Sequence, residues 1–474
     1  MSRLRSVDDQ IARMMAVVEP LAIDVVPVEV SLGRVLAADV TAVLPVPPFD
    51  NSAMDGFALR FADVAGLPDN ALVLPVSGDV PAGAASTALE PGTAQRVMTG
   101  APLPAGADTV VPVEQTDQPA GPARLPTTIR LTERPMQGRH IRREGEDLQP
   151  GASVLVAGTR LGPAHIAAAV STGHGEVAVY RRPRVAVIST GDELVAPGVA
   201  LGPGQIPDSN GPQLAALAQE WGAVVTRVAR VADTADEFGR VLRAALDEAD
   251  LVITTGGVSV GAFEVVRQSL EGLGRADEAP AGGDPSQSDS TLAARAGVEF
   301  TRVAMQPGKP QGFGRVADSR GRLVPLLALP GNPVSSFVSF HVLARPVLAV
   351  LAGLDPQAER RTVPVRVVHG WSSPAGKRQY IPLAVTRGEA GLQASAAHRL
   401  GSGSHLIASL HLANCLGDVP PDVADVVPGD IVEVIPTSAT STHATSTHAT
   451  STHATSTHAT STRVPSSAAE GIWP

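Results

Sequence analysis

PRVAVISTG, residues 183–191, is an almost continuous apolar run that ends in small polar residues. A run without polar alternation is typical of a strand that is buried on both faces of a parallel sheet. Two later runs follow the same plan, residues 250–255 before Gly256-Gly257 and residues 324–329 before Pro330-Gly331. Because segments with a helical period separate these runs, the sequence predicts a parallel sheet with helices on both faces.

The segment between the first two runs carries a helical pattern. Apolar residues recur at positions 214, 217 and 221, and Ser209 or Asn210 stands where a helix cap is expected. A polar stretch at 276–296, rich in proline and glycine, is predicted to be a mobile insertion. The other elements predicted for this module are a strand at 224–231 and helices at 234–249 and 334–351.

Changes in composition predict a multidomain α/β plus β protein, which suits 474 residues of which 43% are hydrophobic. Proline and glycine interrupt short apolar runs between residues 47 and 147, which indicates a β-rich domain. After residue 361, predicted strands at 362–368, 379–385, 406–408 and 431–435 indicate a small β-barrel or sandwich. The expected domains are a linker or dimerisation domain (1–46 and 148–182), the β-rich domain (47–147), a three-layer α/β module (183–355), a C-terminal β-barrel (361–436) and a disordered tail of THATS repeats (437–474).

The charge balance limits the classes of partner. The formal net charge is −10 and the pI is near 5.6, which argues against a general nucleic-acid surface. Cys415 is the only cysteine, so an intrachain disulfide and a cysteine-rich metal site are excluded. The N-terminal residues lack the apolar core of a signal peptide, and no run of about 18 apolar residues occurs, so we expect a cytoplasmic protein outside the membrane.

Ligands of parallel α/β sheets bind at the C-terminal ends of the strands, so the turns after the apolar runs are candidate binding sites. In TTGGVSVG (254–261), glycines let backbone N–H groups approach a ligand and hydroxyls add donors, as in a phosphate cradle. An isolated Gly-Gly is more often a tight connection, but the similar turn LPGNPVS (329–335) favours a cradle. The candidate binding residues at these turns are Thr190, Gly191, Asp192, Ser209, Thr255, Gly256, Gly257, Ser259, Gly261, Pro330, Gly331, Asn332, Pro333 and Ser335.

Charged residues lie in two of the turns. Asp192 and Glu193 follow the first strand, and beside a phosphate they require a cation, for which Mg²⁺ is the usual ion. The alternative of a helix-capping Asp192 with a solvated Glu193 stays open. Lys309 lies in the stiff turn MQPGKP (305–310) and is a candidate cation for an oxyanion, although a loop lysine is more often only a surface residue.

The combination of motifs is more specific than any one of them. TGDEL, TTGGVSVG, PGKP and LPGNPVS follow PPFDNSAMDGFAL (47–59) and MTGAPLPAGADTVVP (98–112) in this order. Together they resemble the molybdopterin molybdenumtransferase family, the molybdenum-insertion enzymes of molybdenum cofactor synthesis, which are related to the E domain of gephyrin. The resemblance covers roughly residues 5–436. It implies an elongated four-part protomer that forms a homodimer.

The resemblance also implies a reaction. Such an enzyme takes adenylylated molybdopterin and molybdate, inserts the metal into the dithiolene and releases AMP with the help of Mg²⁺ or Zn²⁺. The NSAMDGF loop, which is too polar to be expected as a strand, would then face the active cleft of the partner subunit. An upstream molybdopterin adenylyltransferase is an expected partner. By resemblance, the catalytic residues are Asp55, Thr99, Asp147, Glu193 and Asp233, the molybdate pocket is Lys309, Pro330, Ser335, Arg378 and Ser404, and the metal ligands are Asp192, Glu193 and Glu264.

Three positions depart from the family pattern. Gln306 stands where the family commonly has the first lysine of a K-P-G-K turn, so we predict weaker molybdate binding. Glu264 would replace a shorter acidic residue, and Pro382 stands where a second basic residue is expected. Two other functions therefore stay open, a molybdopterin adenylyltransferase and a catalytically inactive scaffold of the same fold.

Overall fold

The computed structural model describes residues 4–85, 87–258, 266–267, 269–270, 297–389, 391–398 and 403–438. Ser259, Gly261, Glu264, the predicted insertion at 276–296 and the tail from residue 439 lie outside the described residues. The chain divides into two compact units, Met1–Asp24 with Tyr180–Pro474, and Val25–Val179. Each unit is described by itself.

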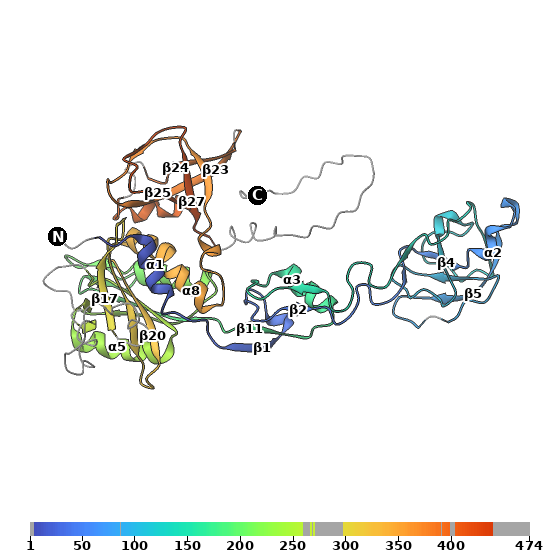
Figure 1. The fold of residues 1–474 in the computed structure, drawn as a ribbon, viewed down its shortest axis with the longest axis horizontal. Helices are drawn as coiled ribbons and strands as arrows, with labels where there is room; N and C mark the ends of the chain where they lie inside the picture. Colours follow the sequence, from blue (N-terminus) through green and yellow to red (C-terminus); the bar gives the residue numbers. More distant parts are fainter. Residues whose placement is uncertain are drawn as a thin grey trace, which may run out of the picture. The chain divides into compact units, whose positions relative to one another are not determined.

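A six-stranded sheet forms the centre of the first unit, in the order β15-β12-β16-β20-β19-β17 (Figure 1). The first four strands are parallel, as the apolar runs predict. The last two pair antiparallel, and they were not predicted because proline, glycine and polar residues interrupt their sequences. The strands are β15 (Val224–Val231), β12 (Arg184–Thr190), β16 (Leu251–Thr255), β20 (Leu323–Leu329), β19 (Pro310–Ala317) and β17 (Gly297–Arg302).

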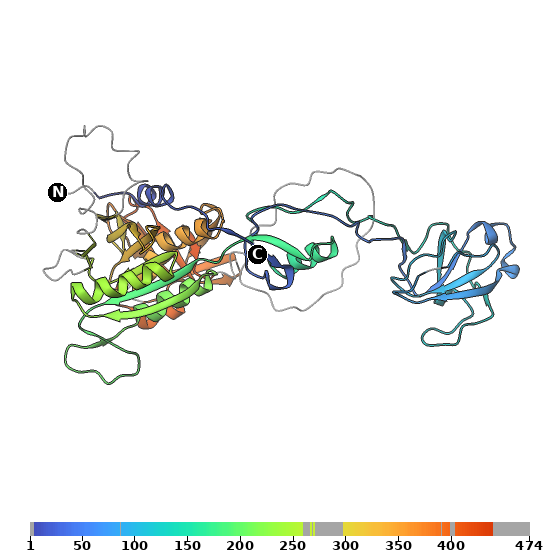
Figure 2. The same cartoon turned by 90° about the horizontal axis from the view of Figure 1, so that it is seen from below.

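Helices cover both faces of this sheet (Figure 1, Figure 2). Val185 and Val187 of β12 pack in a core with Leu214 of α4, whereas Ala186 and Ile188 pack in another core with Phe238 of α5. Alternate residues of one strand are thus buried on opposite faces, which confirms the predicted three layers. The helices are α1 (Val7–Met15), α4 (Asn210–Glu220), α5 (Ala235–Glu248), α7 (Pro333–Ser339) and α8 (Arg345–Leu351), with the π-helical turn η5 (Phe340–Ala344) between the last two.

Two helices of this module need comment, and for the first the expected cap is wrong. Ser209 occupies the N-cap position of α4, but its side chain makes no cap bond; instead, Asp208 Oδ1 accepts from the Gly211 N–H at 3.0 Å. The segment Pro333–Leu351 has 19 residues and a mean hydropathy of 1.7, long and apolar enough to cross a membrane by length and composition. Because 89% of its apolar window is buried inside the protein, it is a core helix of this module.

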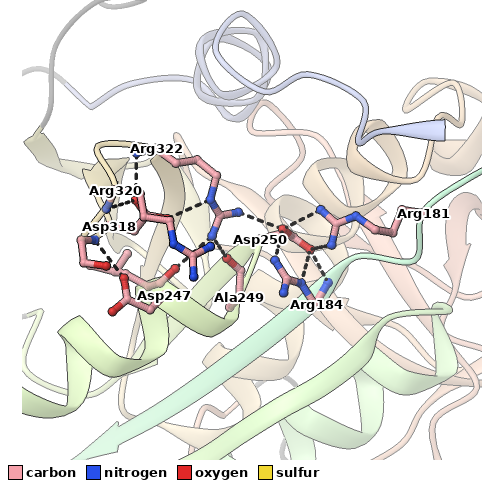
Figure 3. Close-up of polar contacts among 10 residues, drawn as sticks. Arg181, Arg184, Asp247, Ala249, Asp250, Asp318, Arg320 and Arg322 are labelled. Atoms are coloured by element: carbon pink, nitrogen blue, oxygen red, sulfur yellow. Dashed lines mark hydrogen bonds and ion pairs between the residues drawn. The ribbon is translucent and has the colours of Figure 1, made fainter. Parts of the chain in front are cut away.

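Charged residues gather at the edge of the sheet where β12, β16 and β20 begin, opposite the strand-end turns (Figure 3). The Asp250 carboxylate accepts hydrogen bonds from Arg181, Arg184 and Arg322 at 2.9 to 3.1 Å. Arg322 also donates to Asp318 and to the Ala249 carbonyl at the end of α5. This Asp250 cluster joins three strand starts to one helix end.

The C-terminal part of the first unit is a closed five-stranded barrel. Its strands pair in the order β23-β24-β21-β27-β25, and β25 pairs again with β23. The predicted strand at 406–408 is wrong: these residues enter the 3₁₀ helix η7 (Ile407–Leu412), since a short apolar run does not distinguish strand from helix. The barrel strands are β21 (Val363–Val367), β23 (Arg378–Gly388), β24 (Gly391–Ala396), β25 (Cys415–Val419) and β27 (Ile431–Pro436).

The second unit contains a five-stranded sheet, β7-β4-β6-β5-β8, over a core that includes Phe57, Val111 and Ile129. Two strand pairs, β1 with β11 and β2 with β10, surround α3 and a separate core. The elements of this sheet are β4 (Gly56–Leu59), β5 (Val73–Val80), β6 (Ala94–Val97), β7 (Thr109–Pro112) and β8 (Thr128–Arg130). The other elements are β1 (Ile23–Pro27), β2 (Val40–Thr41), β3 (Asn51–Ser52), α2 (Ala62–Ala65), β9 (Ile141–Arg142), β10 (Ser153–Leu155), α3 (Pro163–Ser171) and β11 (Glu176–Tyr180).

Short elements complete the first unit. Strand β18 (Met305–Gln306) pairs with the start of β23 and so connects the α/β module to the barrel. The remaining short strands are β13 (Leu194–Val195), β14 (Ile206–Pro207), β22 (Trp371–Ser372) and β26 (Asp425–Val426).

Candidate functional site

A cavity of about 560 Å³ lies at the C-terminal ends of β12, β16 and β20, the edge at which parallel α/β sheets bind ligands. The three strand-end turns converge there. The predicted site residues that line it are Thr190, Gly191, Glu193, Ser209, Asp233, Thr255, Gly256, Gly257, Pro330, Gly331, Asn332, Pro333 and Ser335. Asp192, Lys309, Arg378 and Ser404 are not among the lining residues.

The glycines of the second turn allow the strand ends to pack closely. Gly256 has φ +96°, and a Cβ there would lie 2.5 Å from the Thr190 carbonyl oxygen. Gly257 has φ +62°, and a Cβ there would lie 2.7 Å from Val266. These glycines therefore do form a tight connection after β16, the alternative that the sequence left open. The connection packs against the end of β12, which carries the carboxylates.

A hydrogen-bond network holds the turns together. Asn210 Nδ2 donates to Thr255 Oγ1 at 2.9 Å and to the Gly331 carbonyl at 2.6 Å. Thr255 Oγ1 in turn donates to the Pro330 carbonyl at 3.0 Å, so one amide and one hydroxyl link the ends of β16 and β20 to the start of α4. Asn210 Oδ1 is buried and has no partner among the described residues, which leaves an acceptor at the cavity wall.

Sequence reasoning missed Asp208 and Asn210 as lining residues. Both are buried, at 6% and 8% exposure, and both fix the start of α4. The signal was present in PDSN (207–210), a run of small polar residues before an apolar helix, but it was interpreted only as a cap.

The carboxylates of the cavity fit a magnesium ion that keeps other ligands. Glu193 and Asp233 line the cavity, whereas one oxygen of Asp192 accepts from the Asp233 N–H at 2.9 Å. In the part of the chain that the structure describes, no group of three His, Cys, Asp or Glu side chains is placed to hold a metal ion. Mg²⁺ is commonly bound through one or two carboxylates together with substrate phosphate and water, which this donor set allows.

The barrel meets the cavity through Ser404, whose Oγ accepts from Asn332 Nδ2 at 3.1 Å. Arg378, the predicted oxyanion ligand of the barrel, is instead held by two carboxylates: it binds Asp418 at 2.6 and 2.8 Å and Asp8 at 3.1 Å. Burial lowers the pKa of Arg378, but Asp418 more than offsets this, so its pKa is raised. This pairing weighs against Arg378 as an anion ligand.

Lys377 stands next to it and makes a different contact. Lys377 Nζ donates to Gln306 Oε1 at 3.2 Å, in a half-buried position. Gln306 begins the turn that contains Lys309. Pro310 ends this turn and lines the cavity. The ammonium group missing from position 306 is thus matched by one that the barrel supplies beside it.

The structure brings together two predicted catalytic residues of the second unit. Asp55 Oδ1 accepts from the backbone N–H and the hydroxyl of Thr99 at 2.6 and 2.8 Å, and these bonds hold the pKa of Asp55 below its usual value. The expectation that this stretch is too polar for a strand is wrong, because Asn51–Ser52 and Gly56–Leu59 form β3 and β4 on either side of the Asp55 turn. Asp147, also in this unit, is exposed.

Comparison with known proteins gives consistent matches along the chain. Residues 5–173 match a family model described as the MoeA N-terminal region (domain I and II), residues 186–281 one described as a probable molybdopterin binding domain, and residues 364–437 one described as the MoeA C-terminal region (domain IV). Two curated relatives from Mycobacterium tuberculosis are molybdopterin molybdenumtransferase 2, which is 43% identical over 91% of this chain and 99% of its own length, and molybdopterin molybdenumtransferase 1, which is 36% identical over 91% and 98%.

Solved structures agree. A molybdopterin biosynthesis moeA protein from Pyrococcus horikoshii aligns with a TM-score of 0.71 and 28% identity, covering 92% of this chain and 99% of that one. The fold, the order of the motifs and the full-length relatives lead to one assignment. This chain is a member of the molybdopterin molybdenumtransferase family.

Proposed function

We propose that this chain transfers molybdenum from molybdate to adenylylated molybdopterin and releases AMP, in the cytoplasm. The single observation that carries the proposal is the cavity of about 560 Å³ in which hydroxyls, glycine turns and carboxylates from three strand ends meet. Relatives that match over nine-tenths of the chain are molybdenumtransferases. The adenylyltransferase alternative is not favoured, because those relatives share the flanking domains as well as the α/β module.

The cavity suits the phosphate end of the substrate. The hydroxyls of Thr190 and Ser335 are neutral donors that stabilise an anion without competing charge, whereas the Thr255 hydroxyl donates to the Pro330 carbonyl. Glu193 and Asp233 would hold Mg²⁺, or Zn²⁺, which neutralises charge on the phosphate while the bond to AMP breaks. Asn210 keeps this wall in place by its bonds to the ends of β16 and β20, and Asp208 does so by accepting from the Gly211 N–H at the start of α4.

Molybdate is a tetrahedral dianion and needs cations and N–H or O–H donors. Lys309 and Lys377 flank the Gln306 turn, and Ser404 lies against Asn332 on the cavity wall. We therefore assign Lys377, rather than Arg378, as the basic residue that the barrel contributes, together with Lys309, Pro330, Ser335 and Ser404.

The proposed working unit is a homodimer in which the Asp55 turn of one subunit completes the site of the other. Exposed large apolar side chains on the second unit support an interface there; they include Val25, Val30, Leu32, Val43, Leu44, Val156 and Val170. The pterin nucleotide would be supplied by a molybdopterin adenylyltransferase, whose product is this enzyme's substrate. Asp55, with its lowered pKa, is ionised at neutral pH and available to the reaction.

The test is AMP release from adenylylated molybdopterin in the presence of Mg²⁺, with and without molybdate. Release that depends on molybdate supports the proposal. Consumption of ATP with free molybdopterin would indicate an adenylyltransferase, and silence in both assays would indicate a scaffold.

Asp55→Ala provides the matched variant for this assay. Because Asp55 is exposed, its removal should leave the thermal unfolding midpoint nearly unchanged while turnover is lost. Full turnover in Asp55→Ala would remove the NSAMDGF loop from the active site.

A further inference from the structure

Two buried polar side chains at the start of α4 line the strand-end cavity, and each keeps one oxygen that the fold does not use. Asp208 is 6% exposed and Asn210 is 8% exposed, and both belong to the lining of the cavity of about 560 Å³. The bonds that these residues make to the protein occupy only part of each side chain. The unused oxygens are therefore available to a ligand in the cavity.

The hydrogen bonds of Asn210 determine which atom of its amide is the unused acceptor. Nδ2 donates to the Gly331 carbonyl at 2.6 Å, and because a carbonyl can only accept, the amide cannot be reversed. Nδ2 also donates to Thr255 Oγ1 at 2.9 Å. Oδ1 is buried and accepts no bond from the described residues. A buried acceptor without a partner is unfavourable, so a ligand that carries an O–H or N–H donor would complete it.

Asp208 supplies a second acceptor in the same wall. Its Oδ1 accepts from the Gly211 N–H at 3.0 Å, whereas Oδ2 accepts no bond within the described part of the chain. The Asp208 N–H donates to the Val195 carbonyl at 2.9 Å, which fixes the residue against β13. Gly211 keeps the space for the carboxylate, since a Cβ there would lie 2.7 Å from Oδ2. Alanine is the better helix former, and this contact accounts for the glycine.

The two acceptors lie beside the turns at which the substrate phosphate is expected, because Asn210 is bonded to Thr255 and Gly331 of those turns. On the nucleotide side of that phosphate, the ribose hydroxyls are the nearest donors. An acidic side chain that accepts from a ribose hydroxyl is a recurrent feature of nucleotide sites in α/β folds. Among the described residues, no three acidic or histidine side chains are placed to hold a metal ion, so Asp208 does not form a metal site with Glu193 and Asp233.

We infer that Asp208 and Asn210 bind the 2′- and 3′-hydroxyls of the AMP half of the adenylylated substrate, an inference that rests on the proposed function. The hydroxyls donate to the two unused oxygens, Oδ2 of Asp208 and Oδ1 of Asn210. The phosphate then lies toward the hydroxyls of Thr190 and Ser335, and the negative Asp208 contacts neutral groups of the ligand. This subsite selects a ribonucleotide over its deoxy analogue.

Isothermal titration of the full chain with AMP and with 2′,3′-dideoxy-AMP, both in Mg²⁺, tests the subsite. The wild-type protein should bind AMP about tenfold more tightly, since the two nucleotides differ only in the hydroxyls. Asp208→Asn keeps an oxygen for the Gly211 N–H but replaces the charged acceptor by a neutral N–H₂ group. It should weaken AMP binding about tenfold and leave dideoxy-AMP binding unchanged. Asp236→Asn, at an exposed position in the first turn of α5 outside the cavity, is the matched control and should change neither affinity.

A wild-type unfolding midpoint in each variant shows that the module still folds. Absence of AMP binding to the wild-type protein, or equal affinity for AMP and dideoxy-AMP, overturns the inference, and neither result depends on a variant. Equal weakening of both nucleotides by Asp208→Asn also contradicts it, because the carboxylate would then act on the phosphate or its cation. Molybdate-dependent AMP release is measured on the same preparation, so that failure of the ribose subsite and failure of the proposed function are separate results.

Discussion

The two edges of the parallel sheet hold their charged residues in opposite ways. At the edge where the strands begin, the buried carboxylate of Asp250 is bound by three arginines (Figure 3). At the edge where they end, Glu193 and Asp233 line a cavity together with hydroxyls and glycine turns. The same strands therefore carry a closed ionic cluster at one end and an accessible polar surface at the other.

The difference separates the residues that maintain the fold from those that bind substrate. Burial alone would raise the pKa of Asp250, but hydrogen bonds from Arg184 and Arg181 hold it below its usual value, so the charge is satisfied within the protein. Glu193 is exposed, and a ligand or cation can reach it. Substitutions where the strands begin should lower the free energy of unfolding and leave turnover unchanged. Substitutions where the strands end should lower turnover and leave the free energy of unfolding unchanged.

Asp250→Ala should have the largest effect on stability. It leaves three guanidinium groups facing one another without their carboxylate, and removing one partner of a buried ion pair typically costs about 3–5 kcal/mol. We expect a correspondingly lower free energy of unfolding in urea, with normal AMP release from the molecules that remain folded. Asp247→Asn is the control, since Asp247 is half-buried and its carboxylate accepts from the Ser319 N–H at the margin of the cluster, with no hydrogen bond to Asp250. A wild-type midpoint in Asp250→Ala would show that the cluster is not needed for stability.

Glu193→Gln should have the opposite signature. It keeps the shape of the side chain but removes a charge that would hold the cation, and losing one such electrostatic contact lowers turnover by about 100-fold. The unfolding midpoint should stay at the wild-type value because Glu193 is exposed. Glu237→Gln, at a half-buried position in the first turn of α5 that does not line the cavity, serves as the control for the substitution itself. Unchanged turnover at saturating Mg²⁺ would exclude Glu193 from the chemistry.

The contrast between the two edges also explains what the sequence could and could not predict. Strands β12 and β16 were predicted nearly to the residue, since an apolar run bounded by a small-residue turn carries its own signal. Strands β17 and β19 were missed, because glycines weaken the pattern. Gly312 is there for packing: a Cβ would lie 2.8 Å from the Phe300 ring, a partner that cannot be identified before the strands are paired.

The candidate site shows the same limit. The strand-end turns were predicted to converge, because strand order alone places them at one edge. The partners of individual side chains were not predictable: Arg378 and Lys377 are adjacent in sequence, yet one binds Asp418 and the other Gln306. Arg378 is the first residue of β23 and Lys377 precedes the strand, a boundary that the sequence before Pro382 does not mark.

As the pH falls, acid should destabilise the packing around His341 in η5 before it affects the Asp250 cluster. Burial, with the nearby Arg345 charge, lowers the pKa of His341 from 6.5 to about 3, so His341 is neutral when folded but takes up a proton when unfolded below pH 6.5. Stability due to His341 is therefore lost as the pH falls from 6.5 towards 3, by about 2 kcal/mol at pH 5. The Asp250 contribution is lost only below the usual carboxylate pKa of 3.8.

Thermal unfolding between pH 7 and pH 4 tests this order. His341→Leu should flatten the profile in that range, while the steep loss below pH 4 remains. A profile that falls as steeply in His341→Leu as in the wild type would assign the mild-acid loss to another group.

The smallest effect is expected at the turn where the α/β module meets the barrel. Lys377→Met removes the ammonium that contacts Gln306 and should raise the KM for molybdate about tenfold, which corresponds to about 1.4 kcal/mol, with little change in kcat. Gln306→Lys should act in the reverse direction, because a second ammonium beside Lys309 would strengthen binding of a dianion. In the double variant, the new lysine should restore most of the loss, since the charge and not its origin on the barrel is what the molybdate requires. If Lys377→Met lowers kcat instead, or if Gln306→Lys does not rescue the Lys377→Met variant, Lys377 acts through the geometry of the turn. The molybdate pocket would then include Ser404 of the barrel but not Lys377.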